Sequence, residues 1–350
     1  MSAALQAQPY TDPRDRGGAA QPMLIARNLR RWFNVKGAGK GAVVRAVDGV
    51  SFSLFKGETL GVVGESGCGK STLARLLLHL VVPDSGELIF DGDGVGERAG
   101  VSVAELRRQV QMVFQDSYSS LNPRMPVQDS VAFGPMVNGR SRAESRRIAQ
   151  DILVKVGLRP DLFGPRYPHE LSGGQKQRVN IARALAVGPR MVILDEAVSA
   201  LDKSVEAQVL NLLRQLKRTL NLTYLFISHD LNVVRYISDR VLVMYLGQVV
   251  ELGPASSVFA GARHPYTQAL LDSRLSMEPG QRILAPPLIG DPPSPINPPA
   301  GCRFRTRCAH AEGVCEARMP ALGEWTGRSS HVAACHMTDA QSGHSRAGTA

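Results

Sequence analysis

The chain has 350 residues, of which 43% are hydrophobic and 21% charged, with a formal net charge of +10 at pH 7. This composition allows a full hydrophobic core and excludes the fibrous and disordered classes of protein. No apolar run approaches the roughly 20 residues that a bilayer span needs, and residues 1–22 lack the hydrophobic core of a secretion signal, so we expect a cytosolic chain.

The excess of positive charge leaves two interpretations open. A basic protein could bind nucleic acid or an anionic membrane surface. Here, however, basic residues alternate with acidic ones and form only short clusters, such as the arginines within 140–147. This pattern favours an ordinary solvated surface.

The first part of the chain predicts a disordered lead-in followed by short strands. Residues 1–22 are polar and rich in Pro and Gly, which is typical of disorder. Short β-like runs follow at 24–26, 43–47 and 50–54, with a glycine-rich turn at 36–41 between the first two. Trp32 and Phe33 precede this turn, and the residues alone leave open whether they belong to the core.

A phosphate-binding pattern lies between an apolar strand predicted at 59–63 and a helical segment at 72–78. Its glycines allow a tight loop whose N–H groups point inward at a helix N-terminus, which is a site for anions. The lysine would reach the β- and γ-phosphates of a nucleotide, and the following serine would ligate Mg²⁺. The residues that we expect around the nucleotide are Gly64, Glu65, Ser66, Gly67, Cys68, Gly69, Lys70, Ser71 and Thr72.

Cys68 has two interpretations. A thiol at a helix N-terminus should have a depressed pKa and be reactive. The simpler alternative is that Cys68 occupies a variable position of the loop.

The middle of the chain predicts a helical insertion. A strand is expected at 87–90, and another buried strand pattern at 110–115 ends on Gln115. From 116 to 170 the composition is polar and helical, with the clearest helix at 143–157. The sequence Leu-Ser-Gly-Gly-Gln at 171–175 then opens another helix, for which Ser172 is the expected N-cap.

Two carboxylates follow the next buried strand, predicted at 190–196. Asp195 suits a magnesium ligand and Glu196 suits a general base for an attacking water. Apolar positions within 205–216 mark one face of a helix, and a strand at 223–228 ends before His229, whose role the residues alone leave open between structural and catalytic. Strands alternating with helices predict an α/β fold with a mainly parallel sheet and ligands at the carboxyl ends of its strands.

The order of these motifs resembles that of the ATP-binding subunits of ABC transporters, for which the Leu-Ser-Gly-Gly-Gln sequence is the signature. The resemblance implies an ABC-type phosphate-loop ATPase with a mainly parallel core sheet, an antiparallel β subdomain, a helical insertion and a loop-rich C-terminal extension. It also implies that the chain binds and hydrolyses ATP with Mg²⁺. Family members usually carry Pro-Thr after the catalytic glutamate, whereas this chain has Ala197-Val198.

The resemblance implies a role for individual residues around the nucleotide. Phe33 would stack on adenine, with Trp32 as the second choice. Glu196 would be the catalytic base and His229 the switch that contacts the γ-phosphate, while Gln115 would sense Mg²⁺ and couple to the membrane partner. The expected magnesium ligands are Ser71, Gln115 and Asp195.

The signature is expected to act on the nucleotide of a second subunit. In the family, Ser172, Gly173, Gly174 and Gln175 of one subunit close on ATP held by the other, and Asp202 belongs to the loop that communicates across the dimer. ATP would therefore hold a head-to-tail dimer together, and hydrolysis would open it.

Beyond Gly253 the chain changes character and becomes rich in proline, most densely at 286–295. This segment and the sequences around the first C-terminal cysteines are similar to the C-terminal extension of oligopeptide and dipeptide importer ATPases, a group that also handles nickel, opines and glutathione. We expect a tail at 1–22, an ATPase domain at 23–262 with a helical subdomain at about 116–190, the extension at 263–337 and a second tail at 338–350.

Four cysteines of the extension form a candidate metal centre. They are separated by 5, 6 and 19 residues, and four thiolates on a loop-rich segment could hold either a [4Fe–4S] cluster or a zinc ion. The absence of a C-x-x-C pair favours the cluster, and free thiols are the alternative. The four residues are Cys302, Cys308, Cys315 and Cys335.

The resemblance implies a subunit whose ATP hydrolysis powers import of peptides or related small solutes. Its expected place is the cytoplasmic face of the inner membrane, bound to two transmembrane permease subunits that an extracytoplasmic solute-binding protein supplies. A second ATPase subunit completes the dimer, and we expect a heterodimer rather than a homodimer, with no nucleic acid partner. The alternatives are a soluble ABC ATPase that acts on nucleic acid or ribosomes, and an accessory ATPase of phosphonate breakdown.

Overall fold

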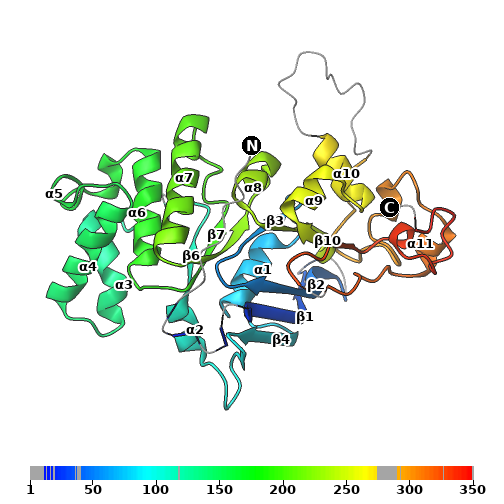
Figure 1. Cartoon of the computed structure of the whole chain (residues 1–350), viewed down its shortest axis with the longest axis horizontal. Helices are drawn as coiled ribbons and strands as arrows, with labels where there is room; N and C mark the ends of the chain where they lie inside the picture. The colour runs from blue at the N-terminus through cyan, green and yellow to red at the C-terminus, as the bar shows by residue number, and fades with distance from the viewer. Residues whose placement is uncertain are drawn as a thin grey trace. The chain divides into compact units, whose positions relative to one another are not determined.

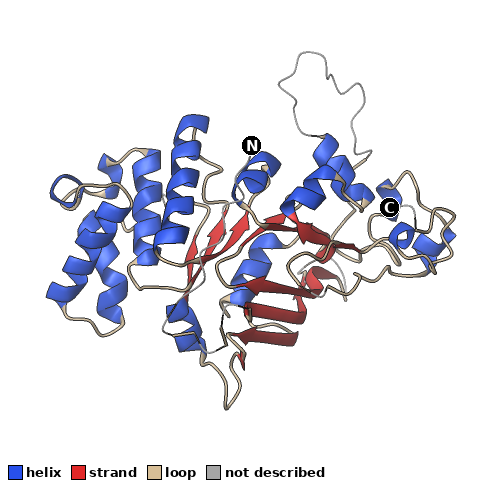
Figure 2. Cartoon of the chain, in the orientation of Figure 1, coloured by secondary structure: helices blue, strands red, loops and turns tan. Residues whose placement is uncertain are grey.

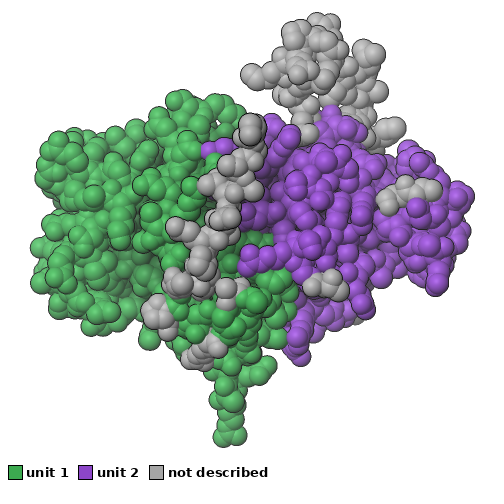
Figure 3. Space-filling model, viewed as in Figure 1, with its two compact units in different colours: residues 1–25, 53–59, 89–227 green, residues 26–52, 60–88, 228–350 purple. Residues whose placement is uncertain are grey.

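A computed structural model describes residues 12, 14, 15, 17, 18, 20–35, 37, 41–116, 119–273, 290, 291, 293–325 and 327–348. The chain forms two compact units (Figure 3). Unit 1 comprises Met1–Ile25, Ser53–Thr59 and Ile89–Ile227, and unit 2 comprises Ala26–Phe52, Leu60–Leu88 and Ser228–Ala350. Several predicted segments lie partly outside the described residues, among them the tails at 1–22 and 338–350, the turn at 36–41 and the proline-dense segment at 286–295.

Unit 1 contains three adjacent parallel strands. These are β6 (Val110–Val113), β7 (Met191–Asp195) and β8 (Thr223–Ile227), with β7 between the other two. Every residue of β7 and β8 is buried, as expected of parallel strands that are covered on both faces and read as continuous apolar runs. The strands predicted at 110–115, 190–196 and 223–228 are therefore confirmed, each ending one or two residues earlier than predicted.

The helical insertion of unit 1 is confirmed (Figures 1 and 2). Helices α3 (Val127–Val137), α4 (Arg142–Lys155) and α6 (Gly173–Leu185) pack against one another. The helix predicted at 143–157 is α4, and Ser141 caps it by accepting a hydrogen bond from the N–H of Glu144. The remaining helices of this unit are α2 (Val103–Gln109), α5 (Pro160–Phe163), the short 3₁₀ helix η1 (Pro168–Glu170) and α7 (Lys203–Thr219).

Unit 2 contains the strand that precedes the phosphate loop and three strands from the C-terminal part of the chain. Strand β3 (Thr59–Val63) runs parallel to β9 (Arg240–Tyr245), and β10 (Gln248–Pro254) is antiparallel to β9. The extension adds the two-residue strand β11 (Val332–Ala333) antiparallel to β10, which sequence patterns did not predict. Unit 2 also contains the helices α1 (Lys70–Leu77), α8 (Leu231–Ile237), α9 (Ala255–Ala260) and α10 (Pro265–Asp272).

A second sheet has the strand order β2-β1-β4-β5. Strands β1 (Pro22–Asn34) and β2 (Val43–Phe55) have 13 residues each, and β4 (Ser85–Phe90) pairs antiparallel with β5 (Asp93–Gly94). The runs predicted at 24–26, 43–47 and 50–54 are thus parts of two long strands. Polar residues interrupt the apolar pattern of these strands, but the backbone ladder continues through them.

The described part of the extension is rich in loops, as predicted. Apart from α10 and β11, the regular elements among its described residues are the 3₁₀ helices η2 (Arg305–Arg307) and η3 (His336–Thr338) and the helix α11 (Gly313–Ala317). Among the described residues of the whole chain, none of the helices is both long enough and apolar enough to span a membrane.

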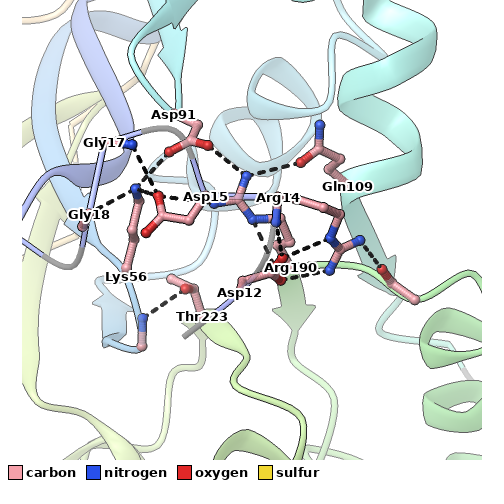
Figure 4. A network of polar contacts seen from close by, with 12 residues as sticks. Asp12, Arg14, Asp15, Gly17, Gly18, Lys56, Asp91, Gln109, Arg190 and Thr223 are labelled. Carbon is pink, nitrogen blue, oxygen red and sulfur yellow. Dashed lines mark hydrogen bonds and ion pairs between the residues drawn. The ribbon is translucent and has the colours of Figure 1, made fainter. Parts of the chain in front are cut away.

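A buried charge network ties residues near the N-terminus into unit 1 (Figure 4). Asp91 accepts hydrogen bonds from Lys56 and Arg190, both at 2.7 Å, and these two cations are 2% and 1% exposed. Asp15 contacts Lys56, and Asp12 lies 3.8 Å from Arg190. Both aspartates belong to the segment predicted as a disordered tail, so its described residues have specific partners. For the rest of that segment, disorder stays a prediction.

The network also sets the charge state of Asp91. Burial raises the pKa of its carboxyl, but the hydrogen bonds from Arg190 and Lys56 outweigh burial and hold that pKa below the ordinary value. Asp91 is therefore an ionised carboxylate that offsets two buried positive charges.

Candidate functional site

The phosphate loop connects β3 to α1 and depends on glycine at two positions. Gly64 and Gly69 have φ angles of 151° and 108°, a region that other residues rarely adopt. A Cβ at Gly69 would lie 2.0 Å from the carbonyl oxygen of Ala46, and one at Gly64 would lie 2.2 Å from that of Met244. The backbone of neighbouring strands therefore touches the loop where only glycine fits.

Lys70 lies within the loop at the N-terminus of α1. Its ammonium group donates to the carbonyl oxygens of Gly64 at 2.7 Å and Glu65 at 2.9 Å, and the residue is only 6% exposed. Ser71 follows in the first turn of the helix and is half-buried, while Ser66 is exposed at the loop tip. A lysine and a set of backbone N–H groups at a helix N-terminus can bind a phosphate group.

The prediction of a depressed pKa for Cys68 is wrong. The side chain is 3% exposed, and burial raises the pKa of the thiol more than the nearby Lys70 ammonium, 3.7 Å away, lowers it. The thiol turns into the interior, and the desolvation of its charged form dominates. Cys68 is a packed, weakly acidic thiol.

The aromatic pair at the end of β1 is not part of the core. Trp32 and Phe33 are each 37% exposed. The Trp32 indole N–H donates to Asp48 at 3.2 Å, and the Arg45 guanidinium lies 4.7 Å from the indole ring. Phe33 has no such hydrogen-bonding group, and its stacking on adenine stays a prediction.

In unit 1 the structure brings two predicted residues into contact. The Gln115 side-chain amide donates to the Glu196 carboxylate at 2.8 Å, although the residues are 81 positions apart. Asp195 ends β7 and is 4% exposed, whereas Glu196 leaves the strand with φ at 48° and donates its N–H to the carbonyl of Ile227. A positive φ at a residue with a side chain is costly and typical of functional turns.

Ala197 and Val198 occupy the two positions where the family usually has Pro-Thr. Both are buried, at 3% and 2% exposure. The turn after Glu196 is closed by Ser199, whose N–H and hydroxyl both donate to the Glu196 carbonyl. The substitution therefore leaves a packed turn behind the carboxylate.

The signature segment begins α6 with a capping box. Ser172 accepts a hydrogen bond from the N–H of Gln175, as predicted for an N-cap, and the Gln175 side chain accepts one in return from the N–H of Ser172. A Cβ at Gly174 would lie 2.4 Å from a methyl group of Val205, so the glycine lets α6 approach the start of α7. Asp202 is the N-cap of α7 and accepts from the N–H of Val205 at 2.9 Å.

His229 is exposed in the turn between β8 and α8. The next residue, Asp230, is the N-cap of α8. The residues predicted around the nucleotide thus divide between the units: the phosphate loop, Phe33 and His229 belong to unit 2, and the others belong to unit 1. The residues of unit 1 are Gln115, Ser172, Gly173, Gly174, Gln175, Asp195, Glu196 and Asp202.

The four cysteines of the extension line one small cavity, together with His264 and Phe304. Burial is the main reason that the pKa of Cys302 is raised to about 11, and charge on the other three thiols contributes to this rise, which reflects their proximity. The described residues contain no three His, Cys, Asp or Glu side chains that converge on a single metal ion.

The comparisons with known proteins agree with these motifs. Residues 47–199 match the ABC transporter family, and residues 250–315 match the family described as oligopeptide/dipeptide transporter, C-terminal region. The oligopeptide transport ATP-binding protein AppF of Bacillus subtilis is 46% identical over 91% of this chain and 98% of its own length. A probable peptide ABC transporter ATP-binding protein, y4tS, of Sinorhizobium fredii is 50% identical over 84% of this chain and 83% of its own length.

Solved structures support the same fold. The cbiO1 protein from Clostridium perfringens, part of the ABC transporter complex cbiONQ, matches with a TM-score of 0.60 at 30% identity, over 68% of this chain and 91% of its own. The ATP-binding cassette MJ0796, in a dimeric post-hydrolysis state bound to ADP and Pi, matches with a TM-score of 0.57 at 27% identity, over 67% of this chain and 99% of its own. The chain belongs to the ABC transporter family, as an ATP-hydrolysing subunit of its oligopeptide/dipeptide branch.

Proposed function

We propose that this ATPase powers the import of peptides or related small solutes. The observation that carries the proposal is the match of 91% of the chain, with part of the extension included, to an oligopeptide transport ATP-binding protein. The alternatives, an ATPase acting on nucleic acid or ribosomes and one accessory to phosphonate breakdown, lack such support from the extension.

The residues of the two units have separate proposed roles in hydrolysis. Lys70 and Ser71 bind the phosphates and Mg²⁺, and Asp195 is a further magnesium ligand. Glu196 accepts a proton from the attacking water, and His229 contacts the γ-phosphate. Two observations support these roles: the anion-binding geometry of the loop, and the hydrogen bond by which Gln115 orients the Glu196 carboxylate. Phe33 stacks on the adenine ring.

We propose that the signature acts on ATP held by a second ATPase subunit. The N-terminus of α6 supports this role, because Ser172 is exposed and the capping box fixes its backbone. A sister ATPase is the preferred partner, with a second copy of this chain as the alternative. Size determination of the Glu196→Gln chain with MgATP, alone and with the sister subunit, distinguishes the two dimers.

The permease partners bind the helical insertion in this proposal. Helix α3 exposes three apolar side chains, Phe133, Met136 and Val137, at 51%, 42% and 68%. Exposed apolar groups of this kind are typical of protein interaction surfaces. Binding to the permeases would place the chain at the cytoplasmic face of the inner membrane.

The transport proposal is tested by reconstitution with the permeases that copurify with the chain. Solute-binding protein loaded with peptide should stimulate ATP hydrolysis and peptide uptake, whereas unloaded binding protein should do neither. The Phe133→Ser variant should lose stimulation and keep the basal ATPase rate. A complex that hydrolyses ATP but moves no peptide, dipeptide or related solute would contradict the proposal.

We further propose a [4Fe–4S] cluster at the four cysteines, with a structural role. Their gathering in one cavity supports a shared site. A single zinc ion needs thiolates that converge at about 2.3 Å, whereas a cluster is ligated at its corners, so its thiolates stand further apart. Anaerobic purification should give about four irons per chain and visible charge-transfer absorption. Protein with neither, or with one zinc ion per chain, would contradict the cluster.

A further inference from the structure

We infer that the C-terminal extension positions the phosphate-binding loop, through Arg307 and Tyr266 acting on Glu65. The inference rests on ATP binding by the loop and is independent of the transported solute. All three residues belong to unit 2. Arg307 and Tyr266 are positioning residues, because both act through their hydrogen bonds to Glu65 of the loop.

Glu65 is the residue of the loop that the extension holds. Both oxygens of its carboxylate accept hydrogen bonds from the Arg307 guanidinium, at 2.9 and 3.1 Å, across 242 residues of sequence. The backbone N–H of Glu65 donates to the Tyr266 hydroxyl at 2.9 Å, and its carbonyl accepts from Lys70. Every polar group of Glu65 is therefore engaged, and two of the three holding side chains come from the extension.

The holding side chains are themselves fixed. Arg307 is 5% exposed as a side chain, and a bidentate arginine–carboxylate pair fixes orientation as well as distance. Burial opposes the charge of Arg307, but its hydrogen bonds to Glu65 outweigh this and raise its pKa above the ordinary value, so it stays charged. Tyr266 is fully buried, and its ring lies 4.5 Å from that of Tyr245 and 5.5 Å from that of Phe304.

A second contact joins the extension to the same unit. Arg303 binds Asp48, the carboxylate that also accepts from the Trp32 indole beside Phe33. Cys302 and Cys308 enclose the short segment that carries both arginines, and η2 forms its second half. The extension thus contacts both the phosphate loop and Asp48 of β2, the carboxylate that accepts a hydrogen bond from the residue before Phe33.

The contacts of Glu65 with Arg307 and Tyr266 matter because the N–H groups of the loop must converge on the phosphate position before ATP binds. A site that is held by buried partners binds more tightly than one that must be ordered on binding. Without both Arg307 and Tyr266, the described hydrogen bonds of Glu65 are those that its carbonyl accepts from Lys70 and from the N–H of Cys68, which both belong to the loop itself. Loss of either side chain should therefore weaken ATP binding while leaving the catalytic groups intact.

The test measures affinity for a fluorescent ATP analogue on the full chain. Arg307→Gln should raise the Kd about tenfold and raise the KM for ATP more than it lowers kcat. Arg307→Lys, which keeps the charge but not the bidentate geometry, should give an intermediate Kd. Tyr266→Phe removes one oxygen and keeps the ring, so it tests the second contact even if Arg307→Gln does not fold.

Arg305 offers a matched control in the same 3₁₀ helix. Its described partners, Ala300 and Glu316, belong to the extension, so Arg305→Gln should leave the Kd unchanged. In a double-mutant cycle, Glu65→Gln and Arg307→Gln should be clearly non-additive. The inference is overturned if Arg307→Gln and Tyr266→Phe bind the analogue as the wild type does, or if Arg305→Gln weakens binding equally.

Discussion

Glu196 occupies a strained backbone position and has its carboxylate held by one amide. The φ of 48° turns the side chain away from the path of β7, and the Gln115 amide donates to it at 2.8 Å. A general base must point at its water with its lone pairs available. In the proposed role of Glu196 as the general base, the turn would aim the carboxylate and the Gln115 amide would fix its rotation.

Replacing Glu196 with Gln should separate binding from hydrolysis. The amide has the shape of the carboxylate but accepts no proton, so we expect kcat to fall by about 10²- to 10⁴-fold. The Kd for MgATP should change little, because the groups that we propose bind the phosphates are untouched. Single-turnover hydrolysis and equilibrium binding measure the two effects, and wild-type turnover would remove Glu196 as the base.

At the scale of the element, the shape of the phosphate loop depends on contacts with residues outside the loop. The glycine spacing predicts the turn, but the reason that Gly69 must be glycine is the carbonyl of Ala46 on β2. Gly67 differs, since it has φ at 77° and no heavy atom within 4 Å of an added Cβ. The two glycines therefore meet different constraints.

Alanine substitutions at these glycines should differ in their cost. Gly67→Ala carries only the left-handed backbone penalty, about 1–2 kcal/mol of the free energy of unfolding. Gly69→Ala adds a backbone clash at 2.0 Å and should cost several kcal/mol more or displace the loop. Thermal unfolding of the two variants gives the comparison, and equal melting temperatures would contradict the contact with Ala46.

Prediction from sequence succeeded for elements whose pattern is local. Buried parallel strands such as β7 are continuous apolar runs, and Ser172 is an N-cap residue at the start of α6. Both elements could therefore be predicted from the sequence. The contacts of Gln115 with Glu196, and of Arg307 with Glu65, join segments 81 and 242 residues apart. Nothing local encodes such pairs. The same holds for Cys68, whose pKa depends on burial that the loop sequence does not reveal.

At the scale of the whole molecule, segments near both ends of the chain make specific tertiary contacts. Residues near the N-terminus enter the buried network around Lys56, Asp91 and Arg190 in unit 1. The C-terminal extension pairs β11 with β10 and binds the phosphate loop, both within unit 2. Each unit thus includes a terminal segment among its structural parts.

The network predicts how stability depends on pH. The folded pKa of Asp91 lies below its ordinary value of 3.8, so its stabilising charge is fully present above about pH 4 and is lost as the pH falls through the folded pKa. Asp91→Asn should lower the free energy of unfolding at pH 7 by about 3 kcal/mol, since it leaves two buried cations with fewer counter-charges. Below pH 4 the difference in the free energy of unfolding between Asp91→Asn and the wild type should become smaller, because Asp91 of the wild type becomes protonated.

Urea unfolding at pH 7 and at pH 3 measures this dependence. The exposed pair of Arg159 and Asp161 provides the control, because a surface ion pair contributes little. Asp161→Asn should change neither curve appreciably. A loss for Asp91→Asn that persists undiminished at low pH would show that its charge is not the cause.

The contact between Arg307 and Glu65 also bears on how members of this family can be recombined. A chimera that joins this ATPase domain to an extension from another transporter would inherit a foreign residue opposite Glu65. Such a hybrid should bind ATP as tightly as this chain only if the donor supplies an arginine and a tyrosine at the positions of Arg307 and Tyr266. For engineering, the loop and the extension are therefore one module, to be exchanged together or not at all.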